Sequence, residues 1–246
     1  MKRIIPLYDY FIFAGKSSLD FRVRISGNGT HHAPERHIET VIVPGRNGDL
    51  TISDERFGTV DQSYDGFIVD DFMDNYSGLV NWLLGHRGNQ RLEDSYHPDE
   101  FRMARFTGPI DPQTVMDEAG KFTLTFKCQP QRFLKIGEHE IIINPNQTKA
   151  FKNPTIMKAL PMITVSGTGT FTISQNGTVI NTVELDQNNG ATVIDSELQD
   201  CYEGTINRNP AVTFTNGYPV FEGNAITEIA AGTGITLRVK PRWWRL

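Results

Sequence analysis

Residues 235–246 read Ile-Thr-Leu-Arg-Val-Lys-Pro-Arg-Trp-Trp-Arg-Leu, and this stretch is the most informative about the fold. Apolar and polar residues alternate over 235–240, which is the period of a β-strand with one buried face. Pro241 ends this strand because proline has no N–H for the ladder. Two interpretations of Arg242-Trp-Trp-Arg245 stay open. We expect the tryptophans to pack on a β-sandwich while the arginines reach solvent; the alternative is a surface that stacks on a sugar or a base.

Composition favours an all-β protein. The 246 residues include 22 glycines and 13 prolines, which suits many short strands and tight turns. A formal net charge of −5 excludes a broad basic surface for nucleic acid. Cys128 and Cys201 are too few for a disulfide framework, so we expect two buried free thiols. Pro6, Tyr8 and Asp9 interrupt the apolar run that a signal peptide needs, and no apolar run reaches the ~18 residues of a membrane span. We therefore expect cytoplasmic synthesis and no membrane insertion.

The N-terminal half is predicted to be strands around one helix. Alternation predicts strands at 11–13, 19–25 and 121–128. Apolar residues at three- and four-residue spacing predict a helix over 74–86, with Asp74 or Asn75 as its N-cap and a glycine at its end. A β-rich run at 38–43 and a second strand from residue 50 flank Pro44-Gly45-Arg46-Asn47-Gly48. That segment holds two turn signals and predicts a hairpin.

The C-terminal half has no helix signal. From about residue 140 it is rich in Thr, Asn, Gly and Ile, with short apolar runs between turns. Asn176-Gly177 is typical of a two-residue β-hairpin. Strands at this spacing predict a sandwich of two antiparallel sheets. We place the domain boundary near residue 137, giving domains 1–136 and 137–246.

Candidate chemistry is sparse. His31, His32 and His37 with Glu35 and Glu39 form the only cluster with metal-binding residue types, and without converging ligands a solvated loop or a subunit contact is favoured. The carboxylate pairs Asp70-Asp71 and Glu93-Asp94 are sequence neighbours, which point to opposite faces of a strand and so favour surface charge. Two Gly-Thr-Gly segments lack the lysine and helix of a phosphate loop, and predict turns. We predict no catalytic, cofactor or metal site, and cannot name interface residues.

Several segments, in order, resemble one known family. In the first half they are Ser18-Leu19-Asp20-Phe21, residues 39–50, the helix with Trp82-Leu83, and residues 120–130. In the second half they are residues 161–169, Ile194-Asp195-Ser196-Glu197 with Tyr202, and residues 219–246. No single piece is diagnostic, but their order and spacing resemble the distal tail proteins (Dit) of long-tailed siphophages and prophages of Gram-positive bacteria.

The resemblance implies a mainly β fold. The N-terminal domain would be a β-sandwich or barrel with one helix and a projecting hairpin, and the C-terminal domain a galectin-like antiparallel sandwich. The resemblance also implies that six copies form a ring, in which relatives use the N-terminal hairpin and exposed strand edges for the contacts; a heterologous interface closes into such a ring when its rotation divides a full turn. Relatives with large carbohydrate-binding insertions exist; this chain looks like the short form.

The implied function is structural, not enzymatic. A hexameric hub in the virion tail tip or baseplate would join the major tail-tube protein to the tail-associated tip protein, with genomic DNA as passing cargo. Two rings could stack. The alternative is a module that binds host cell-wall carbohydrate and aids adsorption. Its support is thin, since few aromatic residues in the C-terminal half lie outside apolar strand patterns.

Overall fold

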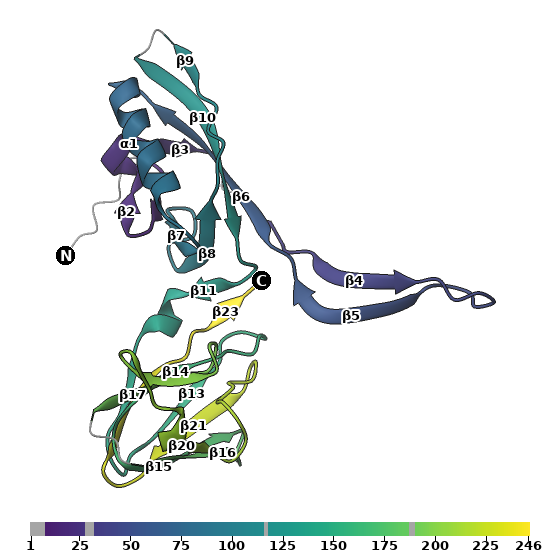
Figure 1. Ribbon diagram of the computed structural model, residues 1–246, viewed down its shortest axis with the longest axis vertical. Coiled ribbons are helices and arrows are strands. Elements are labelled where there is room, and N and C mark those ends of the chain that lie inside the picture. The colour runs from purple at the N-terminus through teal and green to yellow at the C-terminus, as the bar shows by residue number, and fades with distance from the viewer. Residues whose placement is uncertain (1–7, 28–31, 116–117, 187–189) are drawn as a thin grey trace. The chain divides into compact units, whose positions relative to one another are not determined.

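A computed structural model describes residues 8–27, 32–115, 118–186 and 190–246 (Figure 1). Contacts divide the chain into an N-terminal unit, Met1–Arg132 with Leu246, and a C-terminal unit, Phe133–Arg245. That residues 1–136 and 137–246 are separately folding domains stays a prediction. The mainly β fold class is confirmed, with one α-helix in the described residues. None of the helices in these residues combines the length and apolar character that a membrane crossing requires.

The N-terminal unit is built on a curled antiparallel sheet. Its strand order is β2 (Lys16–Ser17), β1 (Phe11–Phe13), β7 (Gln90–Asp94), β8 (Glu100–Phe106), β10 (Ala119–Cys128), β6 (Val60–Ile68) and β3 (Arg24–Ser26), with β9 (Gln113–Val115) pairing the start of β10. The predicted strand at 121–128 is confirmed, and its residues 122, 124, 126 and 128 are all buried.

Helix α1 (Phe72–Gly85) lies along the N-terminal unit and confirms the predicted helix (Figure 1). It buries Phe72, Leu79, Trp82 and Leu83. Trp82 stacks on Phe21 with ring centroids 4.8 Å apart. The predicted cap was wrong: the N-cap is Asp71, in the left-handed region at φ 50°, and it makes no side-chain cap hydrogen bond.

Residues 18–21 also differ from the prediction. They form a 3-10 helix, η1 (Ser18–Phe21), not a strand. Ser17 Oγ accepts from the Leu19 N–H at 3.2 Å, and the Asp20 carboxylate accepts from the Ser17 N–H at 3.2 Å. This capping box fixes a helical turn where alternation alone had favoured an extended chain.

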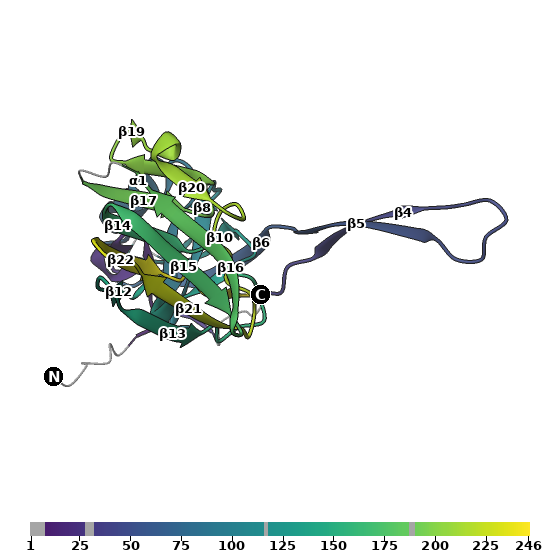
Figure 2. The same ribbon diagram turned by 90° about the horizontal axis from the view of Figure 1, so that it is seen from below.

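The predicted hairpin at 38–52 is confirmed, and it is longer than the sequence indicated. It consists of β4 (Arg36–Val41) and β5 (Leu50–Phe57), which form a two-stranded sheet of their own. Gly45 and Gly48 in the loop adopt φ values of 84° and 81°, which glycine tolerates best. Figures 1 and 2 show the hairpin extending away from the sheet of its own unit, beyond the start of β6.

The C-terminal unit is a sandwich of two antiparallel sheets (Figure 2). The first has the order β12 (Ile141–Ile143), β22 (Ile235–Lys240), β14 (Met162–Gly167), β17 (Ala191–Asp195), β18 (Asp200–Glu203) and β19 (Ile206–Asn207). The second has the order β13 (Thr148–Lys152), β21 (Ile226–Ala231), β15 (Gly169–Gln175), β16 (Thr178–Leu185) and β20 (Val212–Phe214). A short 3-10 helix, η3 (Asn209–Ala211), precedes β20.

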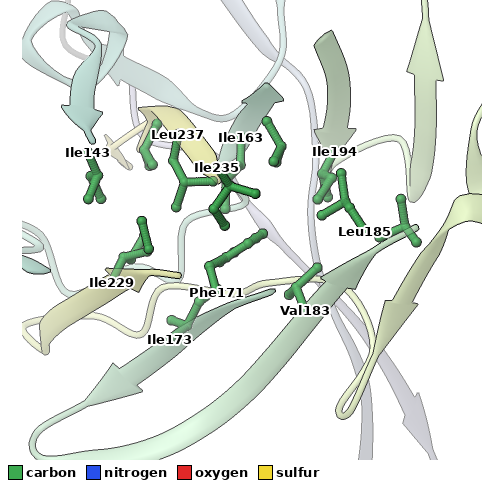
Figure 3. Packing of buried hydrophobic residues seen from close by; sticks show 14 of the residues in the cluster. Ile143, Ile163, Phe171, Ile173, Val183, Leu185, Ile194, Ile229, Ile235 and Leu237 are labelled. Carbon is green, nitrogen blue, oxygen red and sulfur yellow. The ribbon is translucent and has the colours of Figure 1, made fainter. Parts of the chain in front are cut away.

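The core of the sandwich lies between the two sheets. Figure 3 shows Ile235 and Leu237 of β22 facing Phe171 of β15 and Ile229 of β21. Ile235, Leu237 and Val239 have no exposed surface, so the predicted alternation of residues 235–240 is confirmed. Asn176-Gly177 joins β15 to β16, as predicted. Cys128 and Cys201 are buried free thiols, and burial raises their pKa values to about 12 and about 11.

The segment after β22 is bound to the sandwich. Trp243 is buried against Phe221 and Phe151, and Trp244 in β23 (Trp244–Arg245) donates its indole N–H to the Lys158 carbonyl at 2.8 Å. The Trp243 carbonyl accepts from the N–H of Leu134, which ends β11 (Arg132–Leu134), just before η2 (Lys135–Glu138). Packing of the tryptophans is therefore confirmed. The expectation that both arginines reach solvent was wrong for Arg242, which pairs with the buried Asp195.

Candidate functional site

The hairpin is the most exposed apolar element in the described chain. All six residues of β4 are exposed. Six large apolar side chains of the hairpin are also at least 37% exposed, namely Ile38, Val41, Ile42, Val43, Leu50 and Ile52. Exposed apolar side chains gathered on one element mark an interaction site more often than scattered single residues do.

Register assigns these side chains to two faces. Val41 lies opposite Leu50, and Glu39 lies opposite Ile52, so Val41, Leu50 and Ile52 share one face with a single carboxylate, that of Glu39. We call this the apolar face. Thr40 lies opposite Thr51, and Ile38 opposite Ser53, on the other face, which we call the hydroxyl face. A single hairpin thus presents one surface that is mainly apolar, with Glu39 at its edge, and one that is mainly hydroxyl.

Charged pairs hold the base of the hairpin. The imidazole Nδ1 of His37 lies 3.2 Å from the Asp54 carboxylate, and the Arg56 guanidinium lies 3.6 Å from it. The backbone N–H of Arg56, which donates to Asp54 at 3.1 Å, lowers the pKa of that carboxyl, and the neighbouring His37 and Arg56 side chains lower it further. The Arg36 guanidinium also lies over the Phe57 ring, 4.6 Å from its centroid.

The hairpin lacks a covering partner in the described residues, where each of its strands pairs only with the other. A two-stranded sheet without a third strand or a packed face is marginally stable in water. Its outer edges also present backbone groups ready to pair with another chain. The arrangement therefore favours a second molecule that covers the apolar face.

The histidines that the sequence grouped as a metal-binding candidate do not form a site in the described residues. His31 lies outside the described residues, His32 is exposed, and His37 belongs to the hairpin. Within the described chain, no group of three His, Cys, Asp or Glu side chains is placed to hold a metal ion. Asp70 and Asp71 both lie within 4.0 Å of the Arg22 guanidinium on the surface.

A polar network around Asp94 was not predicted from the sequence. The buried Tyr64 hydroxyl donates to Asp94 Oδ2 at 2.8 Å, while the backbone N–H of His97 donates to Asp94 Oδ1 at 2.7 Å. Burial, followed by the charge of Asp94, raises the pKa of Tyr64 well above its ordinary value. The adjoining cavity is about 20 Å³, room for about one water molecule. This network stabilises the turn after β7 and leaves no space for an organic substrate.

The outer face of the second sheet bears on sugar binding. Register places Thr148, Ala230, Thr172 and Thr182 side by side across β13, β21, β15 and β16. The large side chains of these strands, such as Phe171, point into the core. Across the five strands of this sheet, β20 included, the described outward residues have no aromatic platform on which a sugar ring could stack. Among the other aromatic candidates Trp243 is buried, while Trp244 and Tyr202 of β18 are half-buried.

A curled sheet with one helix and a long hairpin, together with a two-sheet sandwich, is an architecture found among solved structures. One solved structure that shares it is the SPP1 Dit (gp 19.1) protein, described as a paradigm of the hub adsorption apparatus in phages that infect Gram-positive bacteria. The match covers 94% of this chain and 97% of that one, with a TM-score of 0.70 and 15% sequence identity. The chain thus has a Dit-like fold, as the resemblance predicted. No protein-family model and no curated protein matches the sequence.

Proposed function

We propose that this chain is a structural component of a phage tail tip, where copies of it form a hexameric hub ring. The observation that carries the proposal is the β4–β5 hairpin, whose apolar face is exposed although a two-stranded sheet needs cover. The Dit-like fold supports it, because the similar SPP1 protein is described as a hub of an adsorption apparatus.

Ring formation follows from the type of contact. A hairpin that reaches from one copy to a different surface of the next makes a heterologous interface, and such an interface closes into a ring when its rotation divides a full turn. The ring would join the major tail-tube protein to the tail-associated tip protein, in the virion tail tip. Genomic DNA would cross its channel as cargo, and the net charge of −5 suits a surface that DNA passes without binding.

The proposed role requires no catalysis. The polar network around Asp94 is the arrangement most like a catalytic site. Its carboxylate already accepts hydrogen bonds from Tyr64 and His97, and the adjoining cavity is the size of a water molecule. Sugar binding by the C-terminal unit has less support than assembly, because its outward threonine row offers hydroxyl groups without an aromatic ring.

Light scattering of the purified chain at several concentrations tests the proposal. Six copies of 27.7 kDa give about 166 kDa, and negative-stain images of that species should show a ring with a central hole. A stable 27.7 kDa monomer at every concentration, with tail-tube protein added as well, would contradict it. A glycan screen of the monomer would then become the next measurement.

A further inference from the structure

A groove on the outer face of the N-terminal sheet has the chemistry to receive the hairpin tip of a neighbouring copy. It has a volume of about 320 Å³ and is lined by β3, β6, β10 and the segment before β9. Register places Phe67 between Arg24 and Lys121, and Asp65 between Ser26 and Thr123. The groove therefore has a half-buried aromatic ring in one row and a carboxylate in the next.

The charged side chains of the groove can pair with a docked segment. Asp111 and Lys121 line the groove, are exposed, and have no ion-pair partner among the described residues. Asp65 accepts from the Thr123 hydroxyl at 2.9 Å, which orients its carboxylate. The groove thus offers two carboxylates and one ammonium group around the Phe67 ring.

The hairpin tip carries the complementary set. Ile42 is 80% exposed, more than any other large apolar side chain in the described chain. Arg46 and Asp49, in the same loop, are exposed and likewise have no ion-pair partner in the described residues. One apolar side chain, one cation and one anion at the tip match one ring, two anions and one cation in the groove.

The same chain cannot supply both halves. The hairpin joins the sheet just before Val60, the first residue of β6, and extends away from that end (Figure 1). The groove lies near the other end of β6, at Asp65 and Phe67. The tip of one chain therefore points away from its own groove, so a hairpin tip that fills the groove would belong to a second copy.

We infer that the tip of each hairpin docks in the groove of the next copy, with Arg46 against Asp111 and Asp65, Asp49 against Lys121, and Ile42 on the Phe67 ring. This inference rests on the proposed ring and names the surface that closes it. The ion pairs fix the orientation of the tip, and the Ile42 contact removes apolar surface from water.

Charge reversal with rescue tests the pairing. Arg46→Glu and Asp111→Arg should each remove the species of about 166 kDa and leave the 27.7 kDa monomer. Their equimolar mixture should assemble again. In that mixture the carboxylate that one variant carries at position 46 meets the guanidinium that the other carries at position 111. The unchanged Arg46 meets the unchanged Asp111, so the two variants alternate around an even-numbered ring. Asp99→Arg, a reversal at an exposed turn outside the groove, is the matched control and should assemble like the original chain.

Folding and proximity are checked separately. Each variant should melt like the original chain, since all the changed side chains are exposed. If a reversal unfolds the protein, the milder Arg46→Gln takes its place. The double variant Arg46→Cys with Asp111→Cys should form intermolecular disulfides under oxidation, because the native thiols are buried.

The outcomes are distinguishable. If the original chain assembles and both reversals assemble equally well, the groove does not receive the tip, although the proposed ring stands. If both folded variants fail and their mixture also fails, the two positions are not partners. If the original chain never assembles, the proposed function fails and this inference fails with it.

Discussion

The guanidinium of Arg242 donates hydrogen bonds of 2.7 and 2.9 Å to the two carboxylate oxygens of Asp195, 47 residues earlier in the chain. This bidentate pair joins the segment after β22 to the end of β17. The Asp195 side chain is 3% exposed and that of Arg242 is 19% exposed, so water competes little for the contact. Arg242 holds its position with φ at 55°, a conformation that non-glycine residues adopt only when surrounding contacts determine it.

Replacing Asp195 with Asn should therefore destabilise the C-terminal unit strongly. Removing one member of a buried ion pair leaves the other charge uncompensated and costs about 3–5 kcal/mol. Urea unfolding of D195N, R242M and the double variant would measure the coupling. Glu222→Gln is the control, because the Lys158–Glu222 pair is 70% and 48% exposed and such pairs contribute about 0–1 kcal/mol. Equal losses for D195N and E222Q would contradict a special role for Asp195.

The same pair predicts that the C-terminal unit loses stability in acid. Burial alone would raise the pKa of Asp195, but the hydrogen bonds and charge of Arg242 outweigh burial and lower it below the ordinary 3.8. A carboxyl with a lowered pKa in the folded state stabilises the protein above its unfolded pKa, and this contribution is lost as pH falls through the folded value. The difference in unfolding free energy between the original chain and D195N should thus be constant well above pH 3.8 and shrink below it. A difference that grows on acidification would overturn the assignment.

Trp243 should contribute more to stability than Trp244. Trp243 is 5% exposed, with its ring centroid 5.9 Å from that of Phe221. Truncating a buried tryptophan to alanine costs about 3–5 kcal/mol. Trp244 is half-buried, so Trp244→Ala should lose less, mainly the hydrogen bond to Lys158 and partial burial. Thermal melting of both variants decides this order, and a larger loss for Trp244→Ala would show that the core does not depend on Trp243.

Local sequence signals predicted those elements whose pattern matches their environment. Residues 121–128 and 235–240 alternate because one face is buried, and Asn176-Gly177 forms the turn that its residues favour. Residues 18–21 carry two conflicting signals. The alternation of Leu19, Phe21 and Val23 predicts a strand, whereas the spacing of Ser17 and Asp20 as a capping box predicts the turn that forms.

Long-range relationships gave no signal that a sequence reading could use. Arg242 meets Asp195 only because β22 and β17 both flank β14. The apolar face of the hairpin depends on register, which pairs Val41 with Leu50 and carries Ile52 to the same side. A shift of one residue would have exchanged the two faces. The sequence therefore predicted the hairpin, and the structure was needed to identify its faces.

The C-terminal unit should fold without the rest of the chain. Residues 133–246 contain both sheets of the sandwich and the core between them. Expressed alone, this fragment should unfold in one cooperative transition. The slope of its unfolding free energy against denaturant concentration should match the surface that a chain of its size exposes on unfolding. The denaturant dependence of near-ultraviolet circular dichroism would report it through Trp243. A fragment without a cooperative transition would mean that the two units are one folding domain.

The two faces of the hairpin should respond differently to a charge. Ile52→Asp places a second carboxylate on the apolar face, directly opposite Glu39, and burying this like-charged pair against a neighbouring copy is costly, so the assembled species should be lost. Thr51→Asp, at the adjacent position on the hydroxyl face, is the matched control and should assemble. Both side chains are exposed, so each variant should unfold within roughly 1 kcal/mol of the original monomer, which includes the repulsion between Asp at position 52 and Glu39. Light scattering distinguishes the two, and loss of assembly in Thr51→Asp alone would mean that the hydroxyl face is the one that neighbouring copies cover.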